Sequence, residues 1–231
     1  MSPDTSQFEL WSHFQTDRLD VFEASKSRLE YLVKLAGKIS PGRRTLLNIG
    51  CGSGYLEKFA KQKNWQVLSV DPDAQSVDRL KAEGIDARCG SIESLPLTSE
   101  SANIVVSTEV FEHLMPDTMD AGLKEIQRVL APGGALIGTV PYREHLPNNE
   151  AYCPHCKMRF HRWGHHQSFD ELAMKSALEK YFSVRKVAPI FFAPWNVLDW
   201  KGKLSVSARL VFSWFGVHGS TSNLLFIAAK K

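Results

Sequence analysis

The chain has 231 residues, of which 43% are hydrophobic and 23% are charged, and its 28 Lys and Arg against 25 Asp and Glu leave a formal net charge of +3. The length fits one domain with appendages, and the composition excludes collagen-like, disordered and disulfide-scaffold proteins. A net charge this small predicts neither a nucleic-acid partner nor an anionic membrane. Partners therefore have to be inferred from individual sites.

The first twenty residues carry acidic side chains throughout and contain no long apolar run, so neither a signal peptide nor a transit peptide is predicted. Four cysteines occur, and only Cys153 and Cys156 lie close in sequence, which favours a reducing compartment. We expect a cytoplasmic protein. The aromatic C-terminal stretches 187–200 and 204–217 fall short of the roughly 20 apolar residues that cross a bilayer. These stretches could instead cover an apolar pocket or contact a membrane surface or lipid.

Apolar residues recur at helical spacing in the first 40 residues, and a Pro-Gly pair follows, so we expect a helical segment at 1–40 ahead of the main domain at 41–231. Beyond it, strand and helix signals alternate, as is typical of an α/β fold with a parallel sheet covered on both faces. Ser168, with Glu171 three residues later, predicts the N-cap of a late helix. Strands are predicted at 45–50, 65–71, 85–90, 102–110, 135–141, 182–190 and 223–230, and helices at 55–62, 74–84, 118–130 and 168–181.

A glycine loop, Gly50-Cys51-Gly52-Ser53-Gly54, joins the first predicted strand to a helix and lets a ligand approach the backbone closely. Asp71 ends the second strand about twenty residues later, where a carboxylate can accept hydrogen bonds from a ribose diol. The dinucleotide fingerprint would need glycine at the position of Tyr55, so NAD fits poorly. The loop and the acid together predict a different nucleotide-type ligand.

The loop of the form GxGxG, Asp71 and three later segments resemble the class I S-adenosylmethionine (SAM)-dependent methyltransferase family over roughly residues 44–141. The three segments are GSIESLP, EVFEHL and RVLAPGGALIGTVP, which begin at positions 90, 109 and 128. The resemblance, closest to the methyltransferase type 11 and ubiquinone-biosynthesis O-methyltransferase groups, implies a Rossmann-like fold. Its sheet would be doubly wound, seven-stranded and mostly parallel, here with N-terminal helices and a Cys/His-rich insertion.

The same resemblance implies roles for residues around the cofactor SAM. The three glycines of the loop would border its methionine part, and Asp71 would hold the ribose hydroxyls. Many relatives carry an acid that receives the adenine amino group at this position, where this chain has Ser91 instead. The implied SAM-binding residues are Gly50, Gly52, Gly54, Asp71, Ser91, Ile92 and Glu109.

The segment EVFEHL follows the fourth predicted strand, at the sheet edge where open α/β sheets bind ligands. His113 is a candidate general base for an oxygen acceptor because histidine titrates near neutrality. By similarity to ubiquinone-biosynthesis O-methyltransferases, Glu109, Glu112 and His113 could hold a divalent cation. The alternative is that Glu112 and His113 only cap and pack the following loop.

Residues 141–168 interrupt the alternation with prolines, histidines and a CxxC pair. Cys153, Cys156, His161 and His165 have the spacing C-x2-C-x4-H-x3-H, which suits a tetrahedral structural zinc ion holding the insertion over the active site. A redox CxxC and a histidine-rich lid with unbound thiols are the alternatives. His166 is a second candidate base, or else lies in solvent.

The sequence therefore predicts an enzyme that transfers a methyl group from SAM to a small molecule. The Asn/Asp-Pro-Pro-aromatic motif of many amino-group methyltransferases is missing at residues 107–110, which favours an oxygen or carbon acceptor. One alternative is a zinc-containing RNA methyltransferase or RNA-binding protein on the same fold, although the basic residues are scattered and make nucleic acid a poor partner. Another is a nonenzymatic SAM-binding domain.

Overall fold

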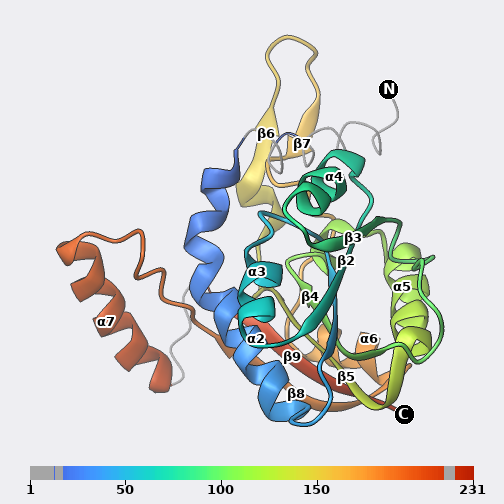
Figure 1. Cartoon of the computed structure of the whole chain (residues 1–231). Coiled ribbons are helices and arrows are strands. Elements are labelled where there is room, and N and C mark those ends of the chain that lie inside the picture. Colours follow the sequence, from blue (N-terminus) through green and yellow to red (C-terminus); the bar gives the residue numbers. More distant parts are fainter. Residues whose placement is uncertain (1–12, 14–17, 216–221) are drawn as a thin grey trace.

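A seven-stranded sheet forms the centre of the computed structural model, which describes residues 13, 18–215 and 222–231 (Figure 1). The strand order is β3-β2-β1-β4-β5-β9-β8. The strands are β1 (Thr45–Ile49), β2 (Gln66–Asp71), β3 (Asp86–Cys89), β4 (Ala102–Thr108), β5 (Leu130–Pro141), β8 (Phe182–Ile190) and β9 (Asn223–Lys230). The helices that flank them are α2 (Lys26–Ile39), α3 (Tyr55–Gln62), α4 (Ala74–Ala82), α5 (Pro116–Val129) and α6 (Glu171–Glu179).

Strands β1 to β5 run parallel, and β9 pairs antiparallel with both β5 and β8. The order reverses direction between β1 and β4, because β1 continues on one side to β2 and β3 while β4 lies on the other. The carboxyl ends of strands at such a switch point form the crevice where α/β sheets bind ligands. The predicted α/β fold with a mostly parallel seven-stranded sheet is confirmed.

Side chains alternate between the two faces of the sheet and fill two apolar clusters. In β4, Val105 belongs to one cluster, and its neighbours Ile104 and Val106 belong to the other. Helices α5 and α6 contribute Leu123 and Leu178 to the first cluster, while α2 and α3 add their own residues to the second. The sheet is thus covered on both faces, and its loops at the strand ends are left to bind ligands.

Most predicted elements appear with nearly the expected bounds, and two local predictions were wrong. The strand predicted at 135–141 already begins at Leu130, directly after α5, because Leu130 pairs with Ala102 of β4. The N-cap of α6 is Asp170, whose carboxylate accepts a hydrogen bond of 2.8 Å from the Ala173 amide, and not Ser168. The carboxylate of Glu171 bonds to the Tyr142 hydroxyl instead of closing a capping box.

The insertion after β5 contains a short 3₁₀ helix, η3 (Leu146–Asn149), and an antiparallel hairpin of β6 (Glu150–Tyr152) and β7 (Arg159–His161). The hairpin projects from the body of the molecule, with its turn farthest out (Figure 1). Residues 162–170 then lead back to the sheet, where Tyr142 pairs with Phe169. The base of the insertion therefore lies against the sheet while its tip stands away from it.

The predicted N-terminal helical segment corresponds to a 3₁₀ helix, η1 (Leu19–Ser25), and α2; residues 1–12 and 14–17 lie outside the described residues. The aromatic C-terminal segment forms α7 (Trp200–Trp214), which extends away from the sheet (Figure 1). No helix among the described residues combines the length and the apolar character needed to span a membrane.

Candidate functional site

A cavity of about 540 Å³ lies at the carboxyl ends of β1, β2 and β4. It collects residues from the glycine loop, the end of β2, the loop after β3 and the segment after β4. Of the predicted cofactor residues, the cavity wall includes Gly50, Gly52, Asp71, Ser91, Ile92 and Glu109, and of the predicted catalytic residues it includes His113. Gly54 is not among the lining residues; it forms the N-cap of α3 and faces Leu80.

The glycine loop adopts backbone conformations that other residues avoid. Gly50 and Gly52 have φ angles of 89° and 48°, and a Cβ at Gly50 would lie 3.1 Å from the Val110 side chain. Asp71, only 2% exposed, fixes this loop because its Oδ2 accepts a hydrogen bond of 2.7 Å from the Cys51 amide. Its Oδ1 accepts from the Asp73 amide at 2.9 Å. The carboxylate thus both shapes the loop and lines the cavity.

The cavity carries an excess of negative charge. The carboxylates among its lining residues are Asp71, Asp73, Glu93 and Glu109, and the basic side chain among them is Arg28. Such a wall favours a ligand with net positive charge. Arg28 lies near Glu109, with Nη1 and Oε2 3.6 Å apart, and its buried Nε has no hydrogen-bond partner among the described residues.

The sequence did not indicate that the N-terminal helices reach this site. Phe22, Ser25 and Arg28 of η1 and α2 line the cavity together with Leu29. Their helical spacing predicted only an amphipathic segment, and no local motif marks Arg28 as a binding residue. Only the packing of α2 and η1 over the glycine loop brings these side chains to the cavity.

Glu109 and His113 form the part of the cavity wall that follows β4. Glu109 has a positive φ of 55°, and its Oε1 accepts hydrogen bonds from the Thr139 hydroxyl at 2.8 Å and the Asn223 amide at 3.0 Å. His113 lies in the 3₁₀ helix η2 (Phe111–His113). Burial, and then the charge of nearby His165, lowers the pKa of His113 to about 3, so its imidazole is neutral in the physiological range.

Glu112 is not among the residues that line the cavity, and it is fully buried. Burial raises the pKa of its carboxyl well above the ordinary value, and the nearby charge of Glu109 raises it further. The Glu112 backbone carbonyl accepts hydrogen bonds from the amides of His166 at 2.7 Å and Gln167 at 3.1 Å. The Gln167 side chain also donates to the Leu114 carbonyl at 2.8 Å. The segment that returns from the insertion to the sheet is thereby fixed against η2.

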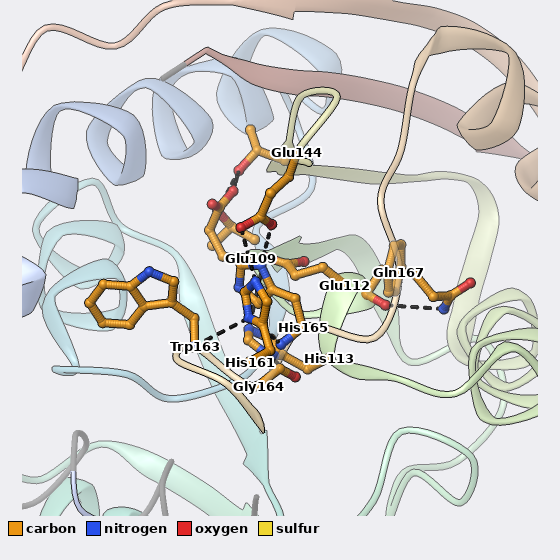
Figure 2. Close-up of polar contacts among 12 residues, drawn as sticks. Glu109, Glu112, His113, Glu144, His161, Trp163, Gly164, His165 and Gln167 are labelled. Carbon is orange, nitrogen blue, oxygen red and sulfur yellow. Dashed lines mark hydrogen bonds and ion pairs between the residues drawn. The ribbon is translucent and has the colours of Figure 1, made fainter. Parts of the chain in front are cut away.

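Three imidazole rings gather at this junction, between the carboxylates of Glu144 and Glu112 (Figure 2). The rings of His113 and His165 are edge-to-face with centroids 4.6 Å apart, and those of His161 and His165 are stacked at 4.7 Å. Two groups of three close ligand atoms occur among the described residues. They are Glu112, His113 and His165, and Glu144, His161 and His165.

The structure divides the predicted zinc ligands into two pairs. Cys153 and Cys156 lie at the turn of the β6–β7 hairpin, whereas His161 and His165 lie at its base beside Glu144. Neither group of close ligand atoms in the described chain contains a cysteine. The structure also differs from the predicted set of cation ligands, Glu109, Glu112 and His113. Glu109 is absent from both groups of close ligand atoms, and His165 lies with Glu112 and His113 in its place. His166 is exposed and does not line the cavity.

Comparison with known proteins bears on this site. Residues 47–138 match the family model described as a methyltransferase domain. A probable S-adenosylmethionine-dependent methyltransferase of Mycolicibacterium smegmatis is 33% identical over 102 residues, which cover 43% of this chain and 39% of that protein. A ubiquinone biosynthesis O-methyltransferase of Bradyrhizobium sp. is 37% identical over 98 residues, 40% of this chain and 38% of that protein. The chain thus spans about two fifths of the length of these curated relatives.

Among solved structures, the 1,6-didemethyltoxoflavin-N1-methyltransferase of Burkholderia thailandensis, with bound 1,6-didemethyltoxoflavin and S-adenosylhomocysteine, superposes with a TM-score of 0.67. The two chains are 13% identical, and the match covers 97% of this chain and 87% of that one. At this identity the likeness establishes the fold alone. The resemblance to SAM-dependent methyltransferases expected from the sequence is confirmed.

Proposed function

We propose that this chain, whose residues 47–138 match the model of a methyltransferase domain, transfers the methyl group of SAM to a small-molecule acceptor. The observation that carries the proposal is the cavity that joins the glycine loop and Asp71 to His113. SAM supplies an already activated methyl group on a sulfonium, so the protein needs no covalent nucleophile. Its tasks are to bind the cofactor, align the acceptor with the methyl and exclude water.

The cavity residues suit SAM in charge and shape. SAM carries a sulfonium, an amino group and a carboxylate, and the acidic wall favours its net positive charge. Arg28, with its buried Nε, would pair with the carboxylate of the methionine part. Asp71 would accept hydrogen bonds from the ribose hydroxyls, and Ser91 and Ile92 would flank the adenine.

The acceptor is proposed to be a hydroxyl compound that enters beside His113. This neutral imidazole lines the cavity together with Thr118. The oxygen preference rests on the absence of the amino-group motif at residues 107–110 and on the likeness to ubiquinone biosynthesis O-methyltransferases. His166, exposed and outside the cavity wall, has less support as a base.

Radiolabelled SAM tests the proposal directly when it is offered with a panel of phenols, sugars, organic acids and total RNA. We expect label in one class of small hydroxyl compound and none in RNA. Label in RNA would favour the alternative of an RNA methyltransferase. SAM binding without transfer to any member of a broad panel would favour a nonenzymatic SAM-binding domain.

We propose a membrane surface as a second partner, contacted through α7. Trp200, Leu204 and Val211 lie on one face of this helix and are exposed, and Phe215 just beyond its end is 79% exposed. The helix carries three basic residues and no acidic one. An apolar aromatic face with basic flanks is typical of helices that lie on anionic bilayers.

We expect the chain to sediment with vesicles that contain anionic phosphatidylglycerol and to stay in solution with neutral phosphatidylcholine vesicles, because the basic residues of α7 add to the apolar contact. The double variant Trp200→Ser and Leu204→Ser should lose binding, while Leu172→Ser, a comparably exposed apolar site on α6, should keep it. Equal sedimentation of both variants would contradict the role of α7.

A further inference from the structure

The group formed by Glu112, His113 and His165 joins the main sheet to the insertion. Glu112 and His113 belong to η2, directly after β4, and His165 belongs to the segment that follows β7. The Glu112 side chain is 0% exposed, and those of His113 and His165 are 14% and 9% exposed. Their candidate ligand atoms all lie within 4.8 Å of one another. Small side-chain rotations would bring them within bonding distance of one ion, since metal bonds to nitrogen and oxygen are about 2.0–2.2 Å long.

Hydrogen bonds assign the protons on two of these rings. The Nδ1 of His113 faces the Gly164 carbonyl at 3.2 Å and donates to it, and the Nδ1 of His165 donates to the Glu144 carboxylate. Each ring then presents Nε2 as its lone-pair atom. Histidine ligands of metals commonly donate their other N–H to a carbonyl or a carboxylate in this way.

In the other candidate group, Glu144, His161 and His165, the ring of His161 has no nitrogen lone pair available for a metal. The Nδ1 of His161 accepts hydrogen bonds from the backbone amides of Trp163 at 3.3 Å and His165 at 3.0 Å. The proton of its neutral ring therefore sits on Nε2, which faces the Glu144 Oε1 at 3.4 Å. A ring that uses one nitrogen to accept and carries its proton on the other has no lone pair left for a metal.

Glu112 supplies the independent observation that points to a cation. Neither of its carboxylate oxygens receives a hydrogen bond among the described residues, although the side chain is fully buried. Removing a carboxylate from water without donors is costly, and native proteins compensate it with a proton, a paired charge or a metal ion. Two imidazole nitrogens beside the carboxylate make a metal ion the compensation that uses all three groups.

We propose that Glu112, His113 and His165 bind one transition-metal ion of the zinc class, which fastens the insertion to the segment after β4. Two imidazoles with one carboxylate favour Zn²⁺ and its transition-metal neighbours over Mg²⁺, which prefers oxygen ligands. Three protein ligands leave at least one coordination position for water or another small ligand. The inference does not rest on the proposed methyl transfer, because the ligand geometry is independent of SAM.

The full chain, produced without a histidine tag and stripped with a chelator, should bind one equivalent of Zn²⁺ or Co²⁺ and melt at a higher temperature with either. Mg²⁺ should not raise the melting temperature. The Co²⁺ form should show visible absorption without the intense near-ultraviolet band of a thiolate ligand. Glu112→Gln and His165→Gln should each weaken Co²⁺ binding at least tenfold, since each removes one of three ligands.

Two matched variants control for the loss of a histidine and for the cysteines. His145→Gln changes an exposed histidine of the same insertion and should bind Co²⁺ like the wild type. The double variant Cys153→Ser and Cys156→Ser should also keep the ion. A thiolate band that disappears in the cysteine variant would overturn the proposal and restore the four-ligand zinc site predicted from the sequence. Absence of binding in a folded, SAM-binding wild type would overturn it as well, leaving a proton on Glu112.

Discussion

Asp71→Ala is expected to weaken SAM binding by about 1.5 to 3 kcal/mol, or roughly ten- to a hundredfold in Kd. Two losses add up in this variant. The ribose hydroxyls lose their proposed acceptor, and the Cys51 amide loses the carboxylate that holds the glycine loop in place. Asp71 is 2% exposed and lines the cavity, so water cannot readily take over both roles.

Calorimetric titration measures this effect, and Asp86→Ala is the matched control. Asp86 lies on neighbouring β3, carries the same charge and does not line the cavity, so its variant should bind SAM like the wild type. The Kd of Asp71→Asn should lie between those of the wild type and Asp71→Ala. The side-chain amide keeps one acceptor oxygen but cannot accept hydrogen bonds from both backbone amides. An unchanged Kd in Asp71→Ala would show that Asp71 does not hold the ribose.

His113→Ala is expected to lower kcat about a hundredfold with the acceptor found by the labelling screen, while the Kd of SAM stays within about twofold. His113 lines the cavity after β4, and its pKa of about 3 keeps the imidazole neutral from pH 8 down to about pH 5. The loss is expected whether Nε2 contacts the acceptor directly or through a bound ion.

Steady-state kinetics of His113→Ala and His145→Ala separate a local role from a general effect of losing a histidine. His145 is exposed and bonds to Asn148, so its variant should keep full activity. His113→Gln can still accept a hydrogen bond and should recover part of the loss if the neutral ring orients the acceptor. Wild-type turnover in His113→Ala would remove this residue from the acceptor site.

Local patterns were sufficient to predict the sheet and much of the cofactor side of the cavity. The apolar run of β9 and the helical pattern of α3 predicted the observed bounds, and Asp71 was found because it ends a strand about twenty residues after a glycine loop. Each of these sequence patterns lies within one helix or strand, or within two elements that are close together in the sequence. The capping prediction failed because Asp170, which follows Ser168 by two residues, is itself a preferred N-cap residue, and its carboxylate accepts a hydrogen bond from the Ala173 amide.

The insertion could not be predicted in this way because its contacts are long-range. Spacing alone grouped two cysteines with two histidines, but a hairpin carries the thiols to its tip and returns the histidines to the sheet. The long-range partners of His165 are Glu144, 21 residues away, and the ring of His113 in η2. Arg28 likewise reaches the cavity only because α2 packs beside it, and no sequence motif predicts that packing.

Calorimetric titration of the wild-type chain with SAM tests the central claim most directly. We predict saturable binding at one site per chain with micromolar Kd, and a free energy of unfolding raised by about 2.7 kcal/mol at a hundredfold excess of SAM over Kd. NAD should give no heat, because Tyr55 occupies the position of the third fingerprint glycine. Absence of both heat and a melting shift with millimolar SAM and S-adenosylhomocysteine would contradict the assignment of the cavity to this cofactor.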